Sequence, residues 1–280
     1  MQHHPLSLQQ LQESFTETYP AYTAIEAVVE ANRCLYCFDA PCIKACPTDI
    51  DVPTFIRKIA TGNTLGAATT LLESNLIGHT CGRVCPVDEL CVGACVLGEA
   101  HRPIAIGRLQ RYATDHLYQR GVMPFDPVPG VGKRVAVVGS GPAGLSAAGE
   151  LAKRGVTVDV FERNDLAGGL STYGIVVMRE PVTVSLDEIE FVKRLGVKVH
   201  TGVAVGRDLD PQRLVAEYDA VVLAAGTGRV PALGVPGEDL EGVIAALPFL
   251  AATKMAEKDG LAALEQVPVG NAVVVIGAGN

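Results

Sequence analysis

The eight cysteines of this 280-residue sequence all lie between Cys34 and Cys95, and the 185 residues after Cys95 contain none. So many thiols in so short a stretch are not explained as inert core residues. A disulfide framework is typical of short secreted chains. The sequence begins without the basic and then apolar segments of a secretory signal, and we expect none. The cysteine-rich part is therefore expected to bind a metal or a metal cluster.

The spacing of the cysteines favours iron–sulfur clusters over zinc. The first run reads C-x2-C-x4-C-x3-C-P, and the second reads C-x3-C-P-x4-C-x3-C. Thiolates bind iron and zinc alike, but zinc sites usually use two closely spaced cysteine pairs for each ion. A run that ends in Cys-Pro is typical of bacterial ferredoxin loops, whose last cysteine often binds the other cluster. Structural zinc stays open as the alternative.

Eight thiols are enough for two clusters with four ligands each. The crossing pattern predicts that one cluster uses the first three cysteines and one from the far end of the run, which are Cys34, Cys37, Cys42 and Cys95. It assigns Cys46, Cys85 and Cys91 to the second cluster. The fourth ligand of that cluster is Cys81, unless another residue takes its position.

The residues around the cysteines carry helix signals. Helices are expected over residues 22–33, from Asp51 to about Ala60, over 64–72 and near 104–118. Asp51 is a favourable N-cap residue, and Pro53 suits a first helical turn. Segment 121–132 is rich in Pro and Gly and is interpreted as a linker. Residues 1–120 are thus predicted to form a helical domain around the cysteine loops.

A strand–turn–helix–strand pattern begins at Lys133. Residues 134–139 indicate a buried parallel strand, because both of its faces are apolar. A G-x-G-x-x-G turn follows, then a helix to Lys153 and a strand over 156–160. Such glycines let the backbone approach a pyrophosphate at the helix N-terminus, and an acid after the second strand accepts the ribose hydroxyls. The residues assigned to the dinucleotide here are Gly139, Gly141, Pro142, Ala143, Gly144, Glu162 and Arg163.

Two further segments favour a flavin dinucleotide over a nicotinamide one. A Gly-Gly-Leu segment closely follows the acid, and a strand over 218–223 ends in a turn of small residues. With the glycine-rich turn, these pieces resemble flavoproteins with two dinucleotide domains, in which such segments line FAD. The resemblance implies an FAD-binding domain over residues 133–270. The residues that the two segments add to it are Gly168, Gly169, Leu170, Ala225, Gly226 and Thr227.

The last residues of the sequence indicate a second domain of the same kind. Residues 272–276 have the composition of another buried strand, and Gly277, Ala278 and Gly279 open a second G-x-G turn. We expect residues 271–280 to be the first strand of a truncated NAD(P)H-binding domain. On this interpretation the chain is part of a longer enzyme and is inactive alone.

Composition argues against several other classes of protein. The net charge is −8 and no basic block stands out, so binding to nucleic acid or to an anionic membrane is not expected. No apolar run approaches the roughly 18 residues of a transmembrane helix, and a cytoplasmic protein is expected. We find no Ser/His/Asp or Cys/His nucleophile arrangement and assign no catalytic residue.

The order of the motifs resembles one group of oxidoreductases. It runs from the double Cys-Pro region through Val-Ala-Val-Val-Gly-Ser-Gly-Pro-Ala-Gly-Leu, Phe-Glu-Arg and Gly-Gly-Leu-Ser-Thr-Tyr-Gly-Ile to Val-Val-Val-Ile-Gly-Ala-Gly-Asn. The chain is similar to the small subunit of bacterial glutamate synthase and to the flavin and iron–sulfur part of dihydropyrimidine dehydrogenase. The second cysteine run, the flavin loop (Gly169-Leu-Ser-Thr172) and segment 104–110 favour the latter.

This resemblance implies an α + α/β fold, with a helical double iron–sulfur cluster domain followed by a Rossmann-like FAD-binding domain and the start of a second Rossmann domain. It implies two 4Fe–4S clusters and FAD, with NAD(P)H bound by the full-length enzyme. Electrons would pass to a catalytic partner subunit that contains FMN and reduces the pyrimidines uracil and thymine. The large subunit of glutamate synthase is the alternative partner. A zinc-stapled, nucleotide-binding interaction module is the alternative from another class.

Two details concern single positions. In the family, segment 104–110 supplies a glutamine to the second cluster, so the resemblance favours Gln110 over Cys81 as its fourth ligand. An amide oxygen is a weaker donor than a thiolate and would change the reduction potential.

Family members also commonly carry Ile-Pro-x-Phe-x-Leu-Pro after the flavin loop. This sequence has Ile175-Val-Val-Met-Arg-Glu-Pro181 instead, which leaves the geometry beside the flavin ring open.

Overall fold

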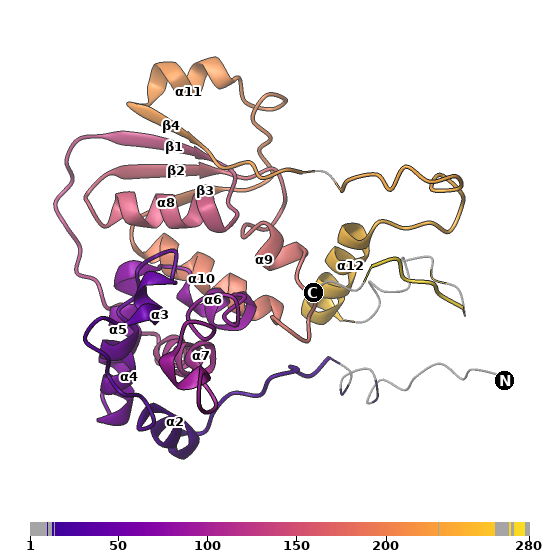
Figure 1. Cartoon of the computed structure of the whole chain (residues 1–280). Coiled ribbons are helices and arrows are strands. Elements are labelled where there is room, and N and C mark those ends of the chain that lie inside the picture. The colour runs from indigo at the N-terminus through magenta and orange to yellow at the C-terminus, as the bar shows by residue number, and fades with distance from the viewer. Residues whose placement is uncertain are drawn as a thin grey trace.

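The N-terminal half of the chain is a group of packed helices (Figure 1, indigo to purple). The computed structural model describes residues 10, 13, 15–228, 230–260, 269 and 272–277. The four predicted helices are confirmed, and their ends lie within two residues of those expected. The elements of this half are α2 (Ala24–Ala31), α3 (Pro41–Lys44), α4 (Val52–Ala60), α5 (Thr64–Ser74), α6 (Gly78–Val84), the 3-10 helix η1 (Val96–Gly98) and α7 (Ile106–Gln119).

Polar side chains begin three of these helices. Thr23 and Glu26 form a capping box at the start of α2, in which each side chain bonds to the other residue's backbone N–H. The Asp51 carboxylate accepts a hydrogen bond from the backbone N–H of Thr54 at 3.1 Å, which caps α4 as predicted. Asn63 caps α5 in the same way. Each cap satisfies a backbone donor that the first helical turn leaves without a partner.

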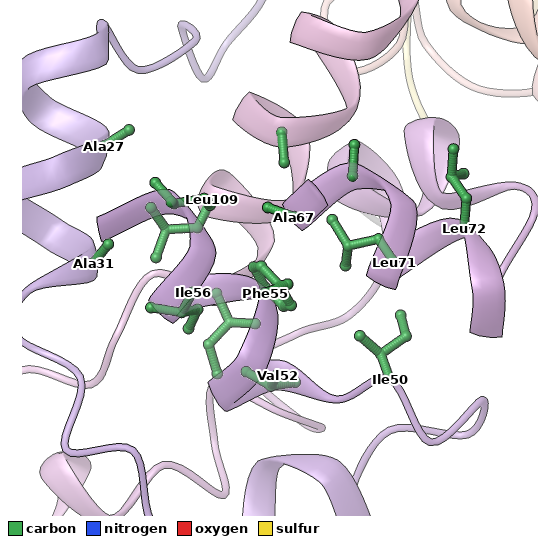
Figure 2. Close-up of a cluster of buried hydrophobic side chains, with 14 of the residues drawn as sticks. Ala27, Ala31, Ile50, Val52, Phe55, Ile56, Ala67, Leu71, Leu72 and Leu109 are labelled. Carbon is green, nitrogen blue, oxygen red and sulfur yellow. The ribbon is translucent and has the colours of Figure 1, made fainter. Parts of the chain in front are cut away.

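The core of the helical half is built where α2, α4, α5 and α7 meet (Figure 2). Phe55 and Ile56 on α4 are completely buried, as are Leu71 on α5 and Leu109 on α7. Alanines supply the facing positions on α2 and part of α5, and their small side chains allow the helix backbones to approach closely. This dense apolar core fixes the helices from which the cysteine loops extend.

The second half is a parallel sheet with helices packed on it. The sheet contains β1 (Arg134–Val138), β2 (Thr157–Phe161), β3 (Lys198–His200) and β4 (Ala220–Leu223) in the order β3-β2-β1-β4. All three strand pairs are parallel. The helices of this half are α8 (Pro142–Ala152), α9 (Leu170–Tyr173), α10 (Val182–Arg194), α11 (Pro211–Glu217) and α12 (Ala246–Asp259). The predicted strand–turn–helix–strand unit and the α + α/β class are confirmed.

The strand order brings two of the predicted functional segments to the same edge of the sheet. The chain moves outward from β1 to β2 and β3, then returns to pair β4 with the other edge of β1. Open parallel sheets bind ligands at the carboxyl ends of their strands, where the strand order reverses. In this sheet that point lies between β1 and β4, whose carboxyl ends lead into the Gly139 turn and into segment 225–227.

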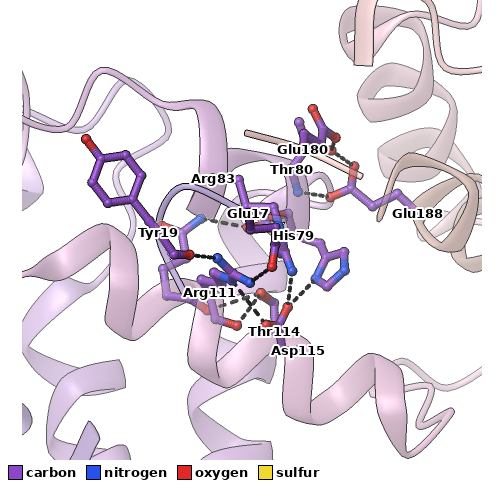
Figure 3. Close-up of polar contacts among 12 residues, drawn as sticks. Glu17, Tyr19, His79, Thr80, Arg83, Arg111, Thr114, Asp115, Glu180 and Glu188 are labelled. Carbon is purple, nitrogen blue, oxygen red and sulfur yellow. Dashed lines mark hydrogen bonds and ion pairs between the residues drawn. The ribbon is translucent and has the colours of Figure 1, made fainter. Parts of the chain in front are cut away.

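The two halves are packed together along α6 and α10. Phe191 and Leu195, from α10 and the residue after it, contact the core of the helical half. An N-terminal strap, residues 16–20, lies across the joint between the halves. The Glu17 carboxylate pairs with Arg83 on α6 and with Arg111 on α7 (Figure 3). The backbone N–H of Thr18 donates to the Met178 carbonyl in the second half at 2.7 Å.

The strand expected over residues 272–276 is not formed in this structure. The described residues there form no strand, and the side chains from Val273 to Ile276 are 63–89% exposed. A strand that is apolar on both faces needs neighbours that bury both faces. None of the described elements does so here. Gly277 is described, whereas Ala278 and Gly279 lie outside the described residues. Among the described residues, no helix has the length and apolar character needed to cross a membrane.

Candidate functional site

Four cysteines of the helical half line one cavity, and we call them the first quartet (Cys34, Cys37, Cys42 and Cys95). Cys34 and Cys37 lie in the loop after α2, Cys42 lies on α3, and Cys95 immediately precedes η1. The cavity is otherwise lined mainly by apolar side chains from α4 and from around the start of α7, which include Val52, Ile56, Ile104 and Ile106. The structure thus brings together the four cysteines that the spacing groups on one cluster.

The remaining four cysteines form the second quartet (Cys46, Cys81, Cys85 and Cys91). Cys46 follows α3, Cys81 lies on α6, Cys85 ends that helix, and Cys91 lies in the turns that follow. Cys81 and Cys85 share a hydrogen bond. Cys85 also interacts electrostatically with Cys91 and Cys46. Cys91 interacts with Cys46 and Cys81, and also with Cys42 of the first quartet. Cys46 therefore lies with the second group although it belongs to the first run of sequence.

Burial raises the pKa of several of these thiols. The pKa of Cys42 rises to about 11 and that of Cys91 to about 12, in both cases chiefly because burial disfavours the thiolate. Burial raises the pKa of Cys34 as well. The hydrogen bond between Cys81 and Cys85 raises the pKa of Cys81 and lowers that of Cys85. The four thiols with a raised pKa are thus protonated at neutral pH, and metal binding would displace their protons.

Gln110 lies on α7, next to the second quartet. Its side chain is 6% exposed, and its Nε2 donates a hydrogen bond to the Gly78 carbonyl at 2.9 Å. The Gln110 and Cys81 side chains also share a hydrogen bond. The structure therefore places Gln110 next to Cys81 of the second quartet, and it does not select one of the two as the fourth ligand.

The chemistry of the donor set fits iron–sulfur clusters. All eight cysteines are free thiols. Four of them line one cavity, and the other four are neighbours of one another. Thiolates are the ligands that such clusters use. Within the part of the chain that the structure describes, no group of three or more His, Cys, Asp or Glu side chains stands in an arrangement that could hold a metal ion. The assignment of the thiols therefore rests on which of them are neighbours.

The glycines of the turn after β1 have two different environments. Gly139 has a φ of +100°, and a Cβ atom there would lie 2.4 Å from the Ala224 carbonyl oxygen. A Cβ atom at Gly144 would lie 1.9 Å from the carbonyl oxygen of Gly139. At Gly141 the nearest atom to an added Cβ is Gly169 Cα, at 4.0 Å. Gly139 and Gly144 are thus required by the fold, whereas Gly141 leaves open space at the N-terminus of α8, beside Pro142 and the exposed Ala143.

Glu162 is buried beneath this turn. Its Oε2 accepts hydrogen bonds from the Ser140 hydroxyl at 2.6 Å and from the Ser140 backbone N–H at 3.1 Å. Its Oε1 accepts from the backbone N–H of Asn164 at 2.9 Å. A carboxylate can accept about four hydrogen bonds, so Glu162 can still accept from a ribose hydroxyl. In this structure its direct effect is to fix the turn.

The other residues assigned to the dinucleotide surround the same sheet edge. The backbone N–H of Gly168 donates to the Ser140 carbonyl and to its hydroxyl, each at 3.1 Å, which ties the Gly-Gly loop to the turn after β1. Gly169 has a φ of +57° and begins α9. The Arg163 guanidinium lies close to Gly228, next to the other segment of the set. The exposed members are Arg163, Leu170, Ala225, Gly226 and Thr227.

Four buried polar residues near the flavin loop were not predicted as site residues. Ser140 occupies the variable position of the G-x-G turn, and its bonds to Glu162 and Gly168 join the two loops. The position in the motif could have indicated Ser140. Thr172 and Ser171 are buried on α9, and Lys254 from α12 donates to the Ser171 carbonyl at 2.6 Å. No sequence motif marks Lys254, because its partner is 83 residues away.

Comparison with known families identifies both halves. Residues 133–280 match the family described as pyridine nucleotide-disulphide oxidoreductase. The chain belongs to this family. Residues 11–122 match a second family, described as dihydropyrimidine dehydrogenase domain II, 4Fe-4S cluster. This member of the oxidoreductase family therefore joins an iron–sulfur domain to a domain of the kind that binds flavin and pyridine nucleotides.

Its relatives include subunits of both expected enzymes. The chain is 36% identical over 264 residues to the NAD-dependent dihydropyrimidine dehydrogenase subunit PreT of Escherichia coli (strain K12), which covers 94% of this chain and 62% of that protein. It is 38% identical over 239 residues to the glutamate synthase (NADPH) small chain of Halomonas elongata, which covers 85% of this chain and 51% of that protein. The predicted resemblance is confirmed. The chain spans about half to three fifths of the length of these relatives.

Proposed function

We propose that the chain is the electron-relay part of an NAD(P)H-dependent oxidoreductase. In the whole enzyme, electrons from NAD(P)H would pass through FAD and two 4Fe–4S clusters to a catalytic partner subunit. The observation that carries this proposal is the division of the eight thiols into two groups of four, in the same chain as a glycine-rich dinucleotide turn.

Each group of residues has a distinct task in this proposal. The first quartet would hold one cluster, and Cys46, Cys85 and Cys91 would hold the other together with Gln110 or Cys81. The Gly139–Gly144 turn and the N-terminus of α8 would bind the pyrophosphate of FAD, while Glu162, Arg163 and segments 168–170 and 225–227 would line its remaining length. A flavin accepts a hydride and releases electrons singly, and iron–sulfur clusters carry single electrons. The chain's own residues bind, orient and shield these groups.

The proposed domain organisation follows from this division of tasks. Residues 1–120 form the iron–sulfur domain, 121–132 the linker, 133–270 the FAD-binding domain, and 271–280 the beginning of an NAD(P)H-binding domain. We propose that the protein is cytoplasmic, because cytosolic reductants keep thiols reduced and available as ligands.

The proposed partner is an FMN-containing subunit that reduces uracil and thymine to dihydropyrimidines. The relative PreT, named as a dihydropyrimidine dehydrogenase subunit, supports this choice. The large subunit of glutamate synthase is the second candidate, because the two glutamate synthase small chains of Halomonas elongata and Escherichia coli are 38% and 34% identical to this chain. Pull-down of each recombinant partner with the reconstituted chain, followed by reduction of the partner's own flavin, distinguishes the two.

The first test is the iron, sulfide, zinc and flavin content of the chain after anaerobic purification. About eight irons per chain together with FAD are expected, because two four-iron clusters contain eight. Zinc without iron or flavin would refute the proposal and leave a zinc-stapled nucleotide-binding module. A Cys37→Ser variant serves as the matched comparison, because it is expected to lose the iron of the first quartet and keep that of the second.

A further inference from the structure

In the joint between the two halves, two buried glutamates contact the same hydroxyl group. Thr80 Oγ1, on α6, lies 2.8 Å from Glu180 Oε1 and 2.6 Å from Glu188 Oε2 (Figure 3). The backbone N–H of Thr80 donates to Glu188 Oε1 at 2.8 Å. Glu180 immediately precedes Pro181 at the start of α10, and Glu188 lies on the second turn of that helix. Glu180 also belongs to segment 175–181, which departs from the family's sequence pattern.

The Thr80 hydroxyl does not have enough hydrogens to donate to two ionised carboxylates. A threonine hydroxyl has one hydrogen, so it can donate to only one of its two carboxyl neighbours. The other short contact is favourable only if that carboxyl carries a proton and donates it to Thr80 Oγ1. Two arrangements satisfy every contact, and in both the Thr80 backbone N–H donates to Glu188 Oε1. Either Glu180 donates to Thr80 Oγ1 and the Thr80 hydroxyl donates to Glu188, or Glu188 Oε2 donates to Thr80 Oγ1 and the hydroxyl donates to Glu180.

Burial of the two glutamates also favours one proton on the pair. Glu180 is 0% exposed and Glu188 is 2% exposed, and Glu180 Oε2 has no hydrogen-bond partner among the described residues. An unpartnered buried oxygen is much less costly on a neutral acid than on a carboxylate. Burial raises the pKa of Glu188 to about 8 and also raises the pKa of Glu180. Because the two groups interact, the proton belongs to the pair.

The neighbouring charged groups do not neutralise the two carboxylates in place of this proton. The groups that face the pair from the packed elements are His79 and Arg83 on α6, Tyr118 on α7, Asp187 on α10, and Lys254 and Glu257 on α12. Burial lowers the pKa of His79 and raises that of Tyr118, so both are neutral near pH 7. Arg83 already pairs with Glu17 and Asp115. Among these groups, which all belong to the described residues, Lys254 is the remaining cation, and one cation does not neutralise two carboxylates.

We propose that Glu180, Thr80 and Glu188 form a binding site for one proton in the joint between the cysteine-rich half and the nucleotide-binding half. With the proton bound, all three side chains are linked and α6 is held to α10. After its loss, two carboxylates share a single hydroxyl in a buried place, and their repulsion weakens the joint. The site consists only of the chain's own side chains and does not depend on which cofactors the chain binds.

The stability of the chain reports this proton. The folded pair keeps its proton up to about pH 8, whereas an unfolded glutamate loses it near pH 4.5. The folded state thus binds more protons than the unfolded state in this interval, and stability falls as pH rises through it. For one proton, the unfolding equilibrium constant rises about tenfold for each pH unit. We expect the Glu180→Gln/Glu188→Gln variant to lose this dependence between pH 5.5 and 7.5, and the exposed control Glu190→Gln to keep it.

Infrared spectroscopy of the wild-type chain tests the site without any variant. Protein labelled with 13C-glutamate is titrated from pH 6 to pH 9, and the C=O stretching band of a protonated carboxyl that shifts with the label is followed. The expected result is one protonated glutamate at pH 6 that ionises by pH 9. No such band at pH 6, or a double variant whose stability keeps the wild-type dependence on pH, would overturn the proposal.

Discussion

Replacing either Gly141 or Gly144 with alanine separates binding of the dinucleotide from stability of the fold. Both glycines belong to the same turn, and each substitution adds one methyl group. At Gly144 the new Cβ would lie 1.9 Å from the Gly139 carbonyl oxygen. At Gly141 it would lie 4.0 Å from its nearest neighbour, on a backbone with φ −65° and ψ 179° that any residue adopts. The two variants therefore probe different properties of one turn.

The size of each effect follows from these distances. Alanine in a helix is favoured over glycine by about 1 kcal/mol, but the overlap at Gly144 requires α8 to move away from β1. Gly139 cannot move in compensation, because it already packs on the Ala224 carbonyl. Overpacking typically costs about 1–3 kcal/mol and sometimes more, so we expect Gly144→Ala to destabilise the chain by about 2 kcal/mol. For Gly141→Ala, the N-cap loss and the reduced entropy of the unfolded chain nearly cancel, to within about 1 kcal/mol.

The assay combines urea unfolding, followed by circular dichroism, with titration of FAD into flavin-free protein. Gly141→Ala is expected to unfold at the wild-type urea concentration but to bind FAD at least about tenfold more weakly, because its methyl group fills the space for the pyrophosphate. Gly144→Ala is expected to unfold at lower urea. Wild-type FAD affinity in Gly141→Ala, or wild-type stability in Gly144→Ala, would refute this reading of the turn.

Three further predictions address the helical half. Cys46→Ser is expected to remove the iron of the second quartet and leave that of the first, measured by iron content and electron paramagnetic resonance; selective loss of the first quartet's signal would overturn the grouping. Because burial raises the pKa of Cys42 to about 11 and that of Cys91 to about 12, the metal-free chain is expected to lose stability as pH rises above about 9, as thermal unfolding can show; unchanged stability up to pH 11 would contradict this. Phe55→Ala is expected to lower the free energy of unfolding by about 3–5 kcal/mol and Asp51→Ala by about 1 kcal/mol, and equal losses in urea unfolding would contradict the assignment of core and cap.

Local chemistry explains which parts of the fold could be predicted from the sequence. Asp51 with Pro53 marks the start of α4 through contacts within three residues, and the glycine spacing marks the turn after β1. The grouping of Cys95 with the first quartet was accessible because cysteine spacing reflects shared ligation. The role of segment 272–276 was not accessible, because an apolar run indicates a strand only when neighbours cover it.

The joint between the halves was also beyond sequence analysis. Glu180 and Glu188 are 100 and 108 residues from Thr80, and a glutamate on a helix gives no sign that it is buried. The same holds for Lys254. The unusual residues of segment 175–181 marked this region as different, but only the packing of α10 against α6 shows that Glu180 faces a hydroxyl rather than solvent.

The partners of the N-terminal strap are synthesised in a fixed order. Its partners on α6 and α7, Arg83 and Arg111, leave the ribosome fewer than 100 residues after Glu17. Its other partner, the Met178 carbonyl, follows Thr18 by 160 residues. At about 5–20 residues per second, translation separates Thr18 from Met178 by roughly 8–30 seconds. The strap can therefore settle on the helical half before Met178 has been made, and it then presents a ready backbone donor to the segment that arrives later.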